Sequence, residues 1–298
     1  MTRTGVVTTA FGNRKYLEMA VDLALSLQAV SNLPISVVTN SQGLDYLSEL
    51  PRVFDQVLTD PDLEDCKGAD ILPRAKIAAI RYSPYESSMF LDADVLVTSN
   101  PSKLFKLINN DDDFIIMGRE HSIETIGEIT HNGLPVKTLF EDLRIDKYVH
   151  CFLCCFLFGA SGGTRIAEAM EYGLVQYEVT NEVYGGVLND EVLLGLIGGD
   201  CTLTFFPSVK PNQNQSRAFR WSDSYTIIHS APMRQYELFK TITLVLRNRL
   251  QSQQSKIASI FWLHELLKRR AVTCGLSRRQ FAVIQRVVDR LYGKESNH

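Results

Sequence analysis

Met89-Phe90-Leu91-Asp92-Ala93-Asp94-Val95-Leu96-Val97 is the stretch of the chain that most narrows its fold and chemistry. An apolar run opens onto two carboxylates and then becomes apolar again. On a strand, Asp92 and Asp94 project to the same face, because side chains alternate. Two like charges this close in a mostly buried setting are unfavourable unless a cation lies between them. Mg²⁺ and Mn²⁺ prefer oxygen ligands and often share them with phosphates, so the stretch indicates a metal-assisted site for a phosphate-bearing substrate.

Strand-like and helical patterns alternate on both sides of this stretch. Each strand-like run is short and rich in apolar or β-branched residues, and the helical patterns keep their apolar residues on one face. This alternation is typical of a mostly parallel α/β sheet flanked by helices. Ligands of such sheets bind outside the carboxyl ends of the strands, where Asp92 and Asp94 fall. We predict strands at residues 5–10, 35–39, 53–58, 114–117, 151–158, 203–206 and 225–229, and helices after Asn13, over 73–82, after Asn100, and over 161–172 and 190–196.

The segment 121–148 lacks a sustained helical or alternating pattern. We therefore predict loops and short helices there. Loops carried by a rigid sheet often hold the residues that select a substrate, so we expect substrate specificity to reside in this segment.

Length and composition are those of an ordinary globular protein. The 298 residues are enough for one large domain, or for one domain with an appendage. The apolar fraction of 45% and the charged fraction of 22% are typical of soluble chains. No apolar run reaches the roughly 18 residues that span a bilayer. Residues 1–10 have the pattern of a strand rather than of a signal peptide, so we expect a cytoplasmic protein.

The six cysteines show no framework spacing. In a chain of this length without an export signal, reduced thiols and a reducing compartment are expected. Cys151, Cys154 and Cys155 lie in an apolar run without a second cysteine pair, so we expect buried thiols there rather than a zinc site.

The charge is distributed unevenly, although the net charge is only −3. Residues 237–298 hold 12 Lys or Arg against 4 Asp or Glu and have helical patterns. We predict a catalytic domain over 1–236 and a basic helical extension over 237–298. The extension either packs on the domain or makes peripheral contact with an anionic membrane surface. Nucleic acid is not an expected partner, because the domain is acidic and contains no recognised nucleic-acid module.

The Asp-Ala-Asp motif alone leaves several interpretations open. The carboxylates could simply cap a turn at a strand end, because Asp-x-Asp is common. The string Asp92-Ala93-Asp94-Val95-Leu96 also resembles the first motif of haloacid-dehalogenase-type phosphatases. That resemblance implies Asp92 as nucleophile and Asp94 as acid/base around Mg²⁺. In those enzymes, however, the motif usually lies on the first strand of the core, and here strand and helix patterns precede it.

Four blocks, in order along residues 5–230, resemble the glycogenin-like family-8 glycosyltransferases. The most specific runs from Leu72 to Val97, where Lys76 lies one helix before the Asp-x-Asp strand. The other three are Val6-Val7-Thr8-Thr9-Ala10-Phe11-Gly12-Asn13, which is similar to a first nucleotide-binding strand; Asn189-Asp190-Glu191-Val192-Leu193-Leu194, which resembles an Asp-Gln/Glu helix start; and Ile227-Ile228-His229, which resembles the strand with a late metal-binding His.

The resemblance implies a GT-A fold and a UDP-sugar donor whose sugar is transferred with retention to an unidentified acceptor. Asp92, Asp94 and His229 would bind Mn²⁺ or Mg²⁺, since carboxylates and a neutral imidazole supply oxygen and nitrogen donors. Lys76 would reach the phosphates or the sugar, and Asp190 would face the sugar. The implied donor-binding positions are Thr8, Thr9, Ala10, Asn13, Lys76, Asp92, Ala93 and Asp94.

The sequence also departs from the family pattern. The family's Asn-Ser-Gly strand is Phe152-Leu153-Cys154-Cys155 here, and the residues after His229 are Ser230-Ala231-Pro232-Met233-Arg234 rather than Gly and Lys-Pro-Trp. Both changes fall on the sugar and acceptor side of the expected site. A sugar-nucleotide-binding scaffold without catalysis is therefore a further alternative.

Overall fold

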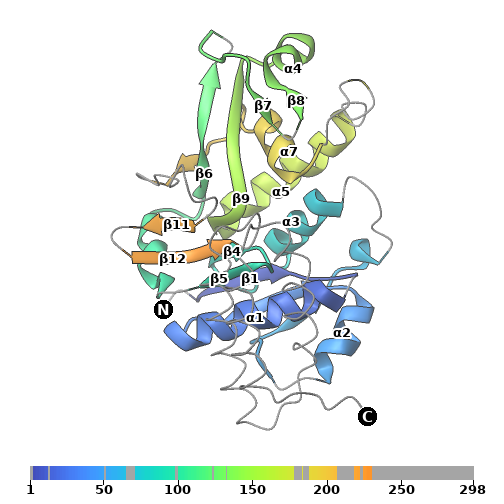
Figure 1. Ribbon diagram of the computed structural model, residues 1–298, viewed down its shortest axis with the longest axis vertical. Coiled ribbons are helices and arrows are strands. Elements are labelled where there is room, and N and C mark those ends of the chain that lie inside the picture. Colours follow the sequence, from blue (N-terminus) through green and yellow to red (C-terminus); the bar gives the residue numbers. More distant parts are fainter. Residues whose placement is uncertain are drawn as a thin grey trace, which may run out of the picture.

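The computed structural model describes residues 3–12, 14–49, 52–64, 71–97, 100–122, 124–131, 133–177, 183, 188–206, 218–221 and 224–229. A seven-stranded sheet with helices on both faces forms the centre of this part of the chain (Figure 1). The sheet has the strand order β10-β6-β9-β4-β1-β2-β3. Its strands are β1 (Thr4–Thr9), β2 (Ile35–Thr39), β3 (Val57–Thr59), β4 (Ser87–Leu91), β6 (Phe114–Ser122), β9 (Lys147–Gly159) and β10 (Thr204–Phe205).

The sheet is mostly parallel, as predicted. β1 pairs in parallel with β2 and β4, β2 with β3, and β10 with β6. β9 runs antiparallel to both of its neighbours, β4 and β6. The α/β class predicted from the alternation of patterns is therefore confirmed, and the carboxyl ends of β1 and β4 share one edge.

Alternating side chains give each face of the sheet its own core. Val6 and Val37 pack on one side with α1 (Arg14–Val30). Val7 and Val38 pack on the other side, with α3 (Ile71–Arg81), α5 (Ala160–Gln176) and α7 (Asp190–Ile197). The apolar face predicted for the first helix is confirmed, since it is buried against the sheet. Its residues are Leu17, Ala20, Val21, Ala24 and Leu27.

Asp92 and Asp94 follow the carboxyl end of β4, as predicted, but they lie in a turn and not on the strand itself. β4 ends at Leu91, and a second strand, β5 (Val95–Val97), begins after Asp94. Asp92 N–H donates to the carbonyl of Cys154 (3.0 Å), and Val95 N–H donates to the carbonyl of Asp92 (3.0 Å). The first bond extends the pairing of β4 with β9 by one residue, and the second closes a turn from Asp92 to Val95.

β5 belongs to a separate three-stranded sheet with β11 (Ala218–Trp221) and β12 (Ser224–His229). β12 lies between the other two strands and pairs antiparallel with both. Ser26 of α1 ties β5 to the central layer, because its hydroxyl accepts a hydrogen bond from Val97 N–H (3.0 Å). The strand predicted at 225–229 is confirmed.

The segment 121–148 contains more regular structure than predicted. β6 and β9 extend into it as a long antiparallel pair, beyond which lie β7 (Thr130–His131), β8 (Leu134–Pro135) and α4 (Val136–Leu143). These elements form the upper part of the molecule in Figure 1. Gly133 turns the β7–β8 hairpin with a φ of +86°, a conformation that glycine adopts without strain.

Two smaller predictions also need correction. The strand predicted over 53–58 is limited to Val57–Thr59, and the helix after Asn100 is a 3₁₀ helix, η2 (Pro101–Leu107). Asn100 caps η2 by accepting from Ser102 N–H (2.9 Å). The remaining elements are α2 (Ser41–Ser48) and η1 (Pro61–Leu63).

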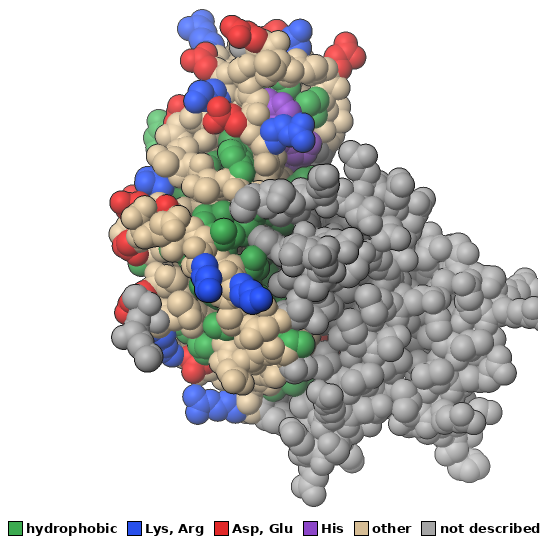
Figure 2. All heavy atoms as spheres, turned by 90° about the vertical axis from the view of Figure 1, so that its left-hand side faces the viewer, with side chains coloured by type: hydrophobic (Ala, Val, Ile, Leu, Met, Phe, Trp, Pro, Cys, Tyr) green, Lys and Arg blue, Asp and Glu red, His purple; other side chains and the backbone are tan. Residues whose placement is uncertain are grey.

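Asn13 and the basic extension at 237–298 lie outside the described residues. Within the described part, no helix combines the length and the apolar character needed to cross a membrane. On the face shown in Figure 2, charged side chains of both signs alternate with small apolar patches over the described residues.

Candidate functional site

The candidate site lies at the carboxyl edge of β1 and β4. Val7 is paired with Phe90, so the end of β1 is level with the turn that begins at Asp92. Ala10 is fixed there, because its N–H donates to Val38 (3.1 Å) and its carbonyl accepts from the Thr39 hydroxyl (2.5 Å). This is the edge at which ligands of parallel sheets bind.

Of the donor-binding positions predicted on β1, Thr8 and Ala10 are buried and Thr9 is half-buried. The Thr8 hydroxyl has no hydrogen-bond partner within the described residues. In the turn, Ala93 is 9% exposed, whereas Asp92 and Asp94 are both half-buried.

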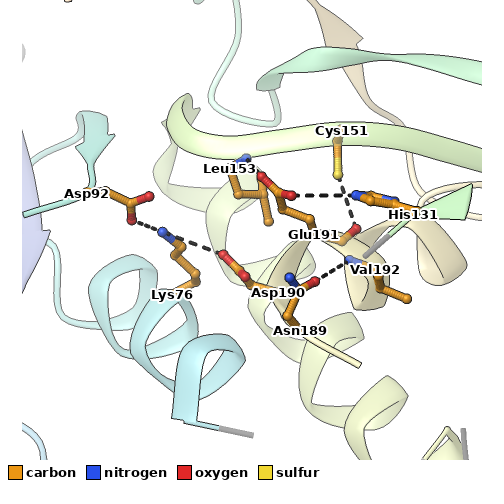
Figure 3. A network of polar contacts seen from close by, with 9 residues as sticks. All are labelled: Lys76, Asp92, His131, Cys151, Leu153, Asn189, Asp190, Glu191 and Val192. Carbon is orange, nitrogen blue, oxygen red and sulfur yellow. Dashed lines mark hydrogen bonds and ion pairs between the residues drawn. The ribbon is translucent and has the colours of Figure 1, made fainter. Parts of the chain in front are cut away.

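Lys76 and Asp190 meet Asp92 at this edge (Figure 3). Lys76, from α3, is buried, and its ammonium forms a hydrogen-bonded ion pair with Asp92 Oδ1. The same Nζ lies 3.6 Å from Asp190 Oδ2 and 4.2 Å from the centroid of the Phe90 ring. One cation therefore joins the turn after β4 to the start of α7, and rests on an aromatic face.

Burial acts differently on the two ends of this contact. For Lys76, burial favours the neutral amine, but the carboxylates of Asp92 and Asp190 outweigh it and raise the pKa above its usual value. For Asp190, burial raises the pKa and Glu191 adds to this effect, while Lys76 opposes it. Lys76 is thus a fixed positive charge, and Asp190 is a carboxyl held in a poorly solvated position.

The start of α7 presents Asp190 to the site. Asn189 caps the helix by accepting from Val192 N–H (3.0 Å), so the cap does not depend on the Asp190 side chain. The Asp190 carboxylate points toward Lys76 (Figure 3). The dipole of α7 favours a carboxylate at its first residue whether or not that residue has a role in the site. Because the Asp190 side chain points toward Lys76, it is also part of the candidate site.

Two further residues of this region, Glu191 and His131, were not among the predicted site residues. Glu191 Oε1 accepts from Leu153 N–H (3.3 Å), and Glu191 Oε2 lies 3.5 Å from His131 Nε2 (Figure 3). The Cys151 thiol donates to the carbonyl of Glu191 (3.3 Å). Glu191 is adjacent to Asp190 in the motif and could have been selected from it. No sequence pattern around His131 indicated a role in the site, because its contact partner, Glu191, lies sixty residues later in the chain.

A bulge in β9 shapes this side of the site. Ile116 pairs with Phe156 whereas Met117 pairs with Phe152, so residues 153–155 have no partners in the β6–β9 ladder. Within the bulge, Leu153 N–H is directed to Glu191 and the Cys154 carbonyl to Asp92 N–H. The segment that departs from the family pattern therefore connects the two acidic parts of the site.

The cysteines of this strand are buried free thiols, as predicted. Burial raises the pKa of Cys151 and of Cys154 well above the usual thiol value, so both remain protonated. Among the described residues, no group of three or more His, Cys, Asp or Glu side chains is arranged to hold a metal ion.

The third predicted metal ligand, His229, is at the end of β12. His229 pairs with Val95, the residue that follows Asp94, so its backbone lies beside the Asp turn. The predicted ligands Asp92, Asp94 and His229 come from distant parts of the sequence, and the pairing places the His229 backbone next to the turn. Oxygen and nitrogen donors of this kind fit Mn²⁺ or Mg²⁺.

A separate hollow of about 440 Å³ lies near the amino end of β2. Its lining includes Gln28, Arg52 and Asp55, and the Arg52 guanidinium donates to the Asp55 carbonyl (3.2 Å). This is the opposite end of the strand from Asp92, Lys76 and Asp190, and none of these three lines it.

Searches of family models and of curated protein sequences find no match for this chain. The glycosyltransferase GlyE of Streptococcus pneumoniae TIGR4 has a similar structure, with a TM-score of 0.51 and 15% identity over 85% of this chain and 65% of GlyE. The galactosyltransferase LgtC, solved with donor and acceptor sugar analogues, has a TM-score of 0.51 and 14% identity over 80% of this chain and 95% of LgtC. The chain thus has the GT-A-like α/β fold of these glycosyltransferases.

Proposed function

We propose that this protein is a metal-dependent glycosyltransferase that moves a sugar, with retention, from a UDP-sugar to an acceptor. The observation that carries the proposal is the Lys76 ammonium between Asp92 and Asp190 at the carboxyl edge of the sheet. Asp92, Asp94, Asp190 and Glu191 place four acidic side chains in this region. An added cation would favour the binding of a negatively charged diphosphate beside them.

Asp92, Asp94 and His229 are the residues that would hold Mn²⁺ or Mg²⁺. Two carboxylates and a neutral imidazole suit either ion, and the pairing of His229 with Val95 supports their proximity. The bound ion supplies Lewis-acid stabilisation of the charge that builds on the departing UDP. Thr8, Thr9 and Ala10 would line the nucleotide at the end of β1, together with Ala93. Asn13, which lies outside the described residues, is a further candidate from the sequence.

Lys76 and Asp190 would contact the donor from α3 and α7, whereas the predicted metal ligands belong to the turn after β4 and to β12. The Lys76 ammonium can turn from Asp92 to a phosphate or sugar oxygen as a fixed positive charge. Asp190 faces the sugar, where its carboxylate stabilises positive charge at the reacting carbon or orients a hydroxyl. The bulge at residues 153–155 lies next to both acidic groups and would border the sugar pocket.

A panel of UDP-sugars tests this function. The melting temperature of the full-length chain is measured with each sugar in Mn²⁺ and again in EDTA, because a ligand bound only by the folded state stabilises it. A stabilising donor is then incubated with the protein, and released UDP is measured. We expect stabilisation that requires the metal, followed by hydrolysis or transfer. Stabilisation without turnover would identify a binding scaffold, and the absence of any stabilisation would contradict the donor assignment.

A further inference from the structure

The contact between His131 and Glu191 is part of a chain of side chains behind the candidate site. His131 on β7 is 4% exposed, and its Nδ1 forms a hydrogen bond with the Tyr148 hydroxyl of β9. Its Nε2 faces Glu191 Oε2 at 3.5 Å and has no hydrogen-bond partner within the described residues. A buried imidazole nitrogen without a hydrogen bond requires an explanation, because burying an unpaired polar atom is unfavourable.

We assign the Tyr148 hydroxyl as the donor to His131 Nδ1, and this assignment decides which ring nitrogen carries the hydrogen. Burial raises the pKa of Tyr148, so the hydroxyl keeps its proton and can donate it to Nδ1. A neutral imidazole that accepts at Nδ1 carries its hydrogen on Nε2. His131 therefore directs its Nε2–H group toward the Glu191 carboxylate. The hydrogen bond at Nδ1 fixes this role of Nε2.

The ring of His131 is also held in place by packing. His150 lies against it with ring centroids 4.4 Å apart, and Tyr148 meets it edge-on at 5.9 Å. Burial and the neighbouring His131 lower the pKa of His150 to about 4, so His150 adds no positive charge at neutral pH. Tyr148 in turn rests on α7, where Gly195 leaves room for its ring.

Glu191 needs such support because of where it lies. Asp190 is the preceding residue, and its carboxylate engages the Lys76 ammonium. Leu153 N–H is directed to one oxygen of Glu191, and His131 faces the other oxygen. Because Glu191 directly follows Asp190 in the first turn of α7, holding the Glu191 carboxylate in place also limits how far the Asp190 carboxylate can move from Lys76.

We propose that His131, supported by Tyr148, is a positioning residue that holds the Glu191 carboxylate in place and thereby keeps Asp190 on Lys76. This role rests on the proposed glycosyltransferase function and adds a residue from the β7–β8 hairpin to it. His131 therefore reaches the site from the β7–β8 hairpin. It acts on the site through Glu191 at the start of α7.

Two variants of His131 separate positioning from folding. His131→Leu removes both nitrogens, whereas His131→Gln retains an N–H donor near the position of Nε2. We expect His131→Leu to lower kcat for donor turnover roughly ten- to a hundredfold, because small displacements at a reacting centre are costly. Its KM and its Mn²⁺-dependent affinity for UDP should change by no more than about twofold. His131→Gln should recover most of the kcat.

Imidazole NMR spectra of the ¹⁵N-labelled full-length chain test the same contact without activity. His131→Gln identifies the His131 signals, which should show hydrogen on Nε2 and none on Nδ1. Glu191→Gln should shift the Nε2 signal, while the exposed control Glu168→Gln should not. A wild type that turns over no donor would remove the proposed function, and these spectra would still decide whether His131 contacts Glu191. Hydrogen on Nδ1 alone, or equal losses of kcat in both His131 variants, would overturn the proposal.

Discussion

Lys76 Nζ lies 3.6 Å from Asp190 Oδ2 while it also pairs with Asp92, so one buried ammonium serves two carboxylates more than ninety residues apart in the sequence. The contact joins α3, the turn after β4 and the start of α7. These are the three elements that converge at the carboxyl edge of the central sheet. The electrostatics at this contact follow from how the Lys76 ammonium is shared.

Lys76→Met should destabilise the protein by about 3 kcal/mol at pH 8, because it leaves the buried Asp190 and the half-buried Asp92 without this cation. The pKa of Lys76 is higher in the folded protein than its usual value of 10.5. Its contribution is therefore complete below pH 10.5 and is lost as the pH rises through the folded-state pKa. Urea unfolding is measured for wild type and variant from pH 8 to alkaline pH. The difference between their free energies of unfolding should narrow only above pH 10.5. The exposed control Lys103→Met should show little effect at any pH.

Asp190→Asn should separate stability from activity. Burial raises the pKa of Asp190 although Lys76 opposes the shift, so folding makes this carboxyl harder to ionise than it is in the unfolded chain. The carboxyl contributes favourably only below its usual pKa of 3.8, and this contribution is lost as the pH rises through the folded-state value. At pH 7 the variant should thus unfold with an equal or higher free energy than wild type, while donor turnover falls. Strong destabilisation at pH 7 would mean that the ion pair with Lys76 outweighs burial.

Gly195→Ala should destabilise the protein through Tyr148. A Cβ at this position would lie 2.6 Å from Tyr148 Cζ and 2.7 Å from its hydroxyl, closer than van der Waals contact allows. We expect a loss of about 1–3 kcal/mol in the free energy of unfolding, as is typical of overpacking. Gly127→Ala is the matched control, since no atom lies within 4 Å of its added methyl group. Equal unfolding midpoints for the two variants would contradict the packing of Tyr148 on α7.

Ser26→Ala should loosen β5, the strand that follows the Asp turn. The substitution leaves the buried N–H of Val97 without its acceptor, at a cost of about 1–3 kcal/mol. Because β5 also pairs with β12, the affinity for Mn²⁺ and UDP should fall together with stability. Ser48→Ala removes a comparable hydroxyl on the exposed helix α2 and should have little effect on either quantity. Unchanged UDP affinity in Ser26→Ala would show that β5 does not support the metal site.

Local patterns were sufficient to predict most of the fold. The sequence predicted the strand that ends at Thr9 and the helix that contains Leu17, Ala24 and Leu27. Burial of one face gives such elements a regular spacing of apolar residues, and this spacing can be recognised in the sequence. The turn at Asp92 was one of several interpretations that the sequence left open. Its geometry depends on the Cys154 carbonyl, which reaches Asp92 from a strand sixty residues later. No local pattern around Asp92 contains that bond.

The candidate site was predictable only in part for the same reason. Lys76 and Asp190 were identified through the resemblance to known motifs, and they do lie beside Asp92. Glu191 and His131 were missed because their contact depends on a hairpin in a segment without periodicity. The bulge that connects both acidic parts of the site is likewise a property of the register between β6 and β9, which sequence patterns do not specify.

Calorimetric titration of UDP in the presence of Mn²⁺ tests the central claim most directly. Wild type is compared with the double variant Asp92→Asn, Asp94→Asn and with a control that changes two exposed carboxylates, Asp45→Asn, Asp112→Asn. We predict binding by wild type and by the control that disappears in EDTA, and no measurable binding by the Asp92, Asp94 variant. Undiminished Mn²⁺-dependent binding of UDP by that variant would contradict the assignment of this edge of the sheet as a metal and nucleotide site.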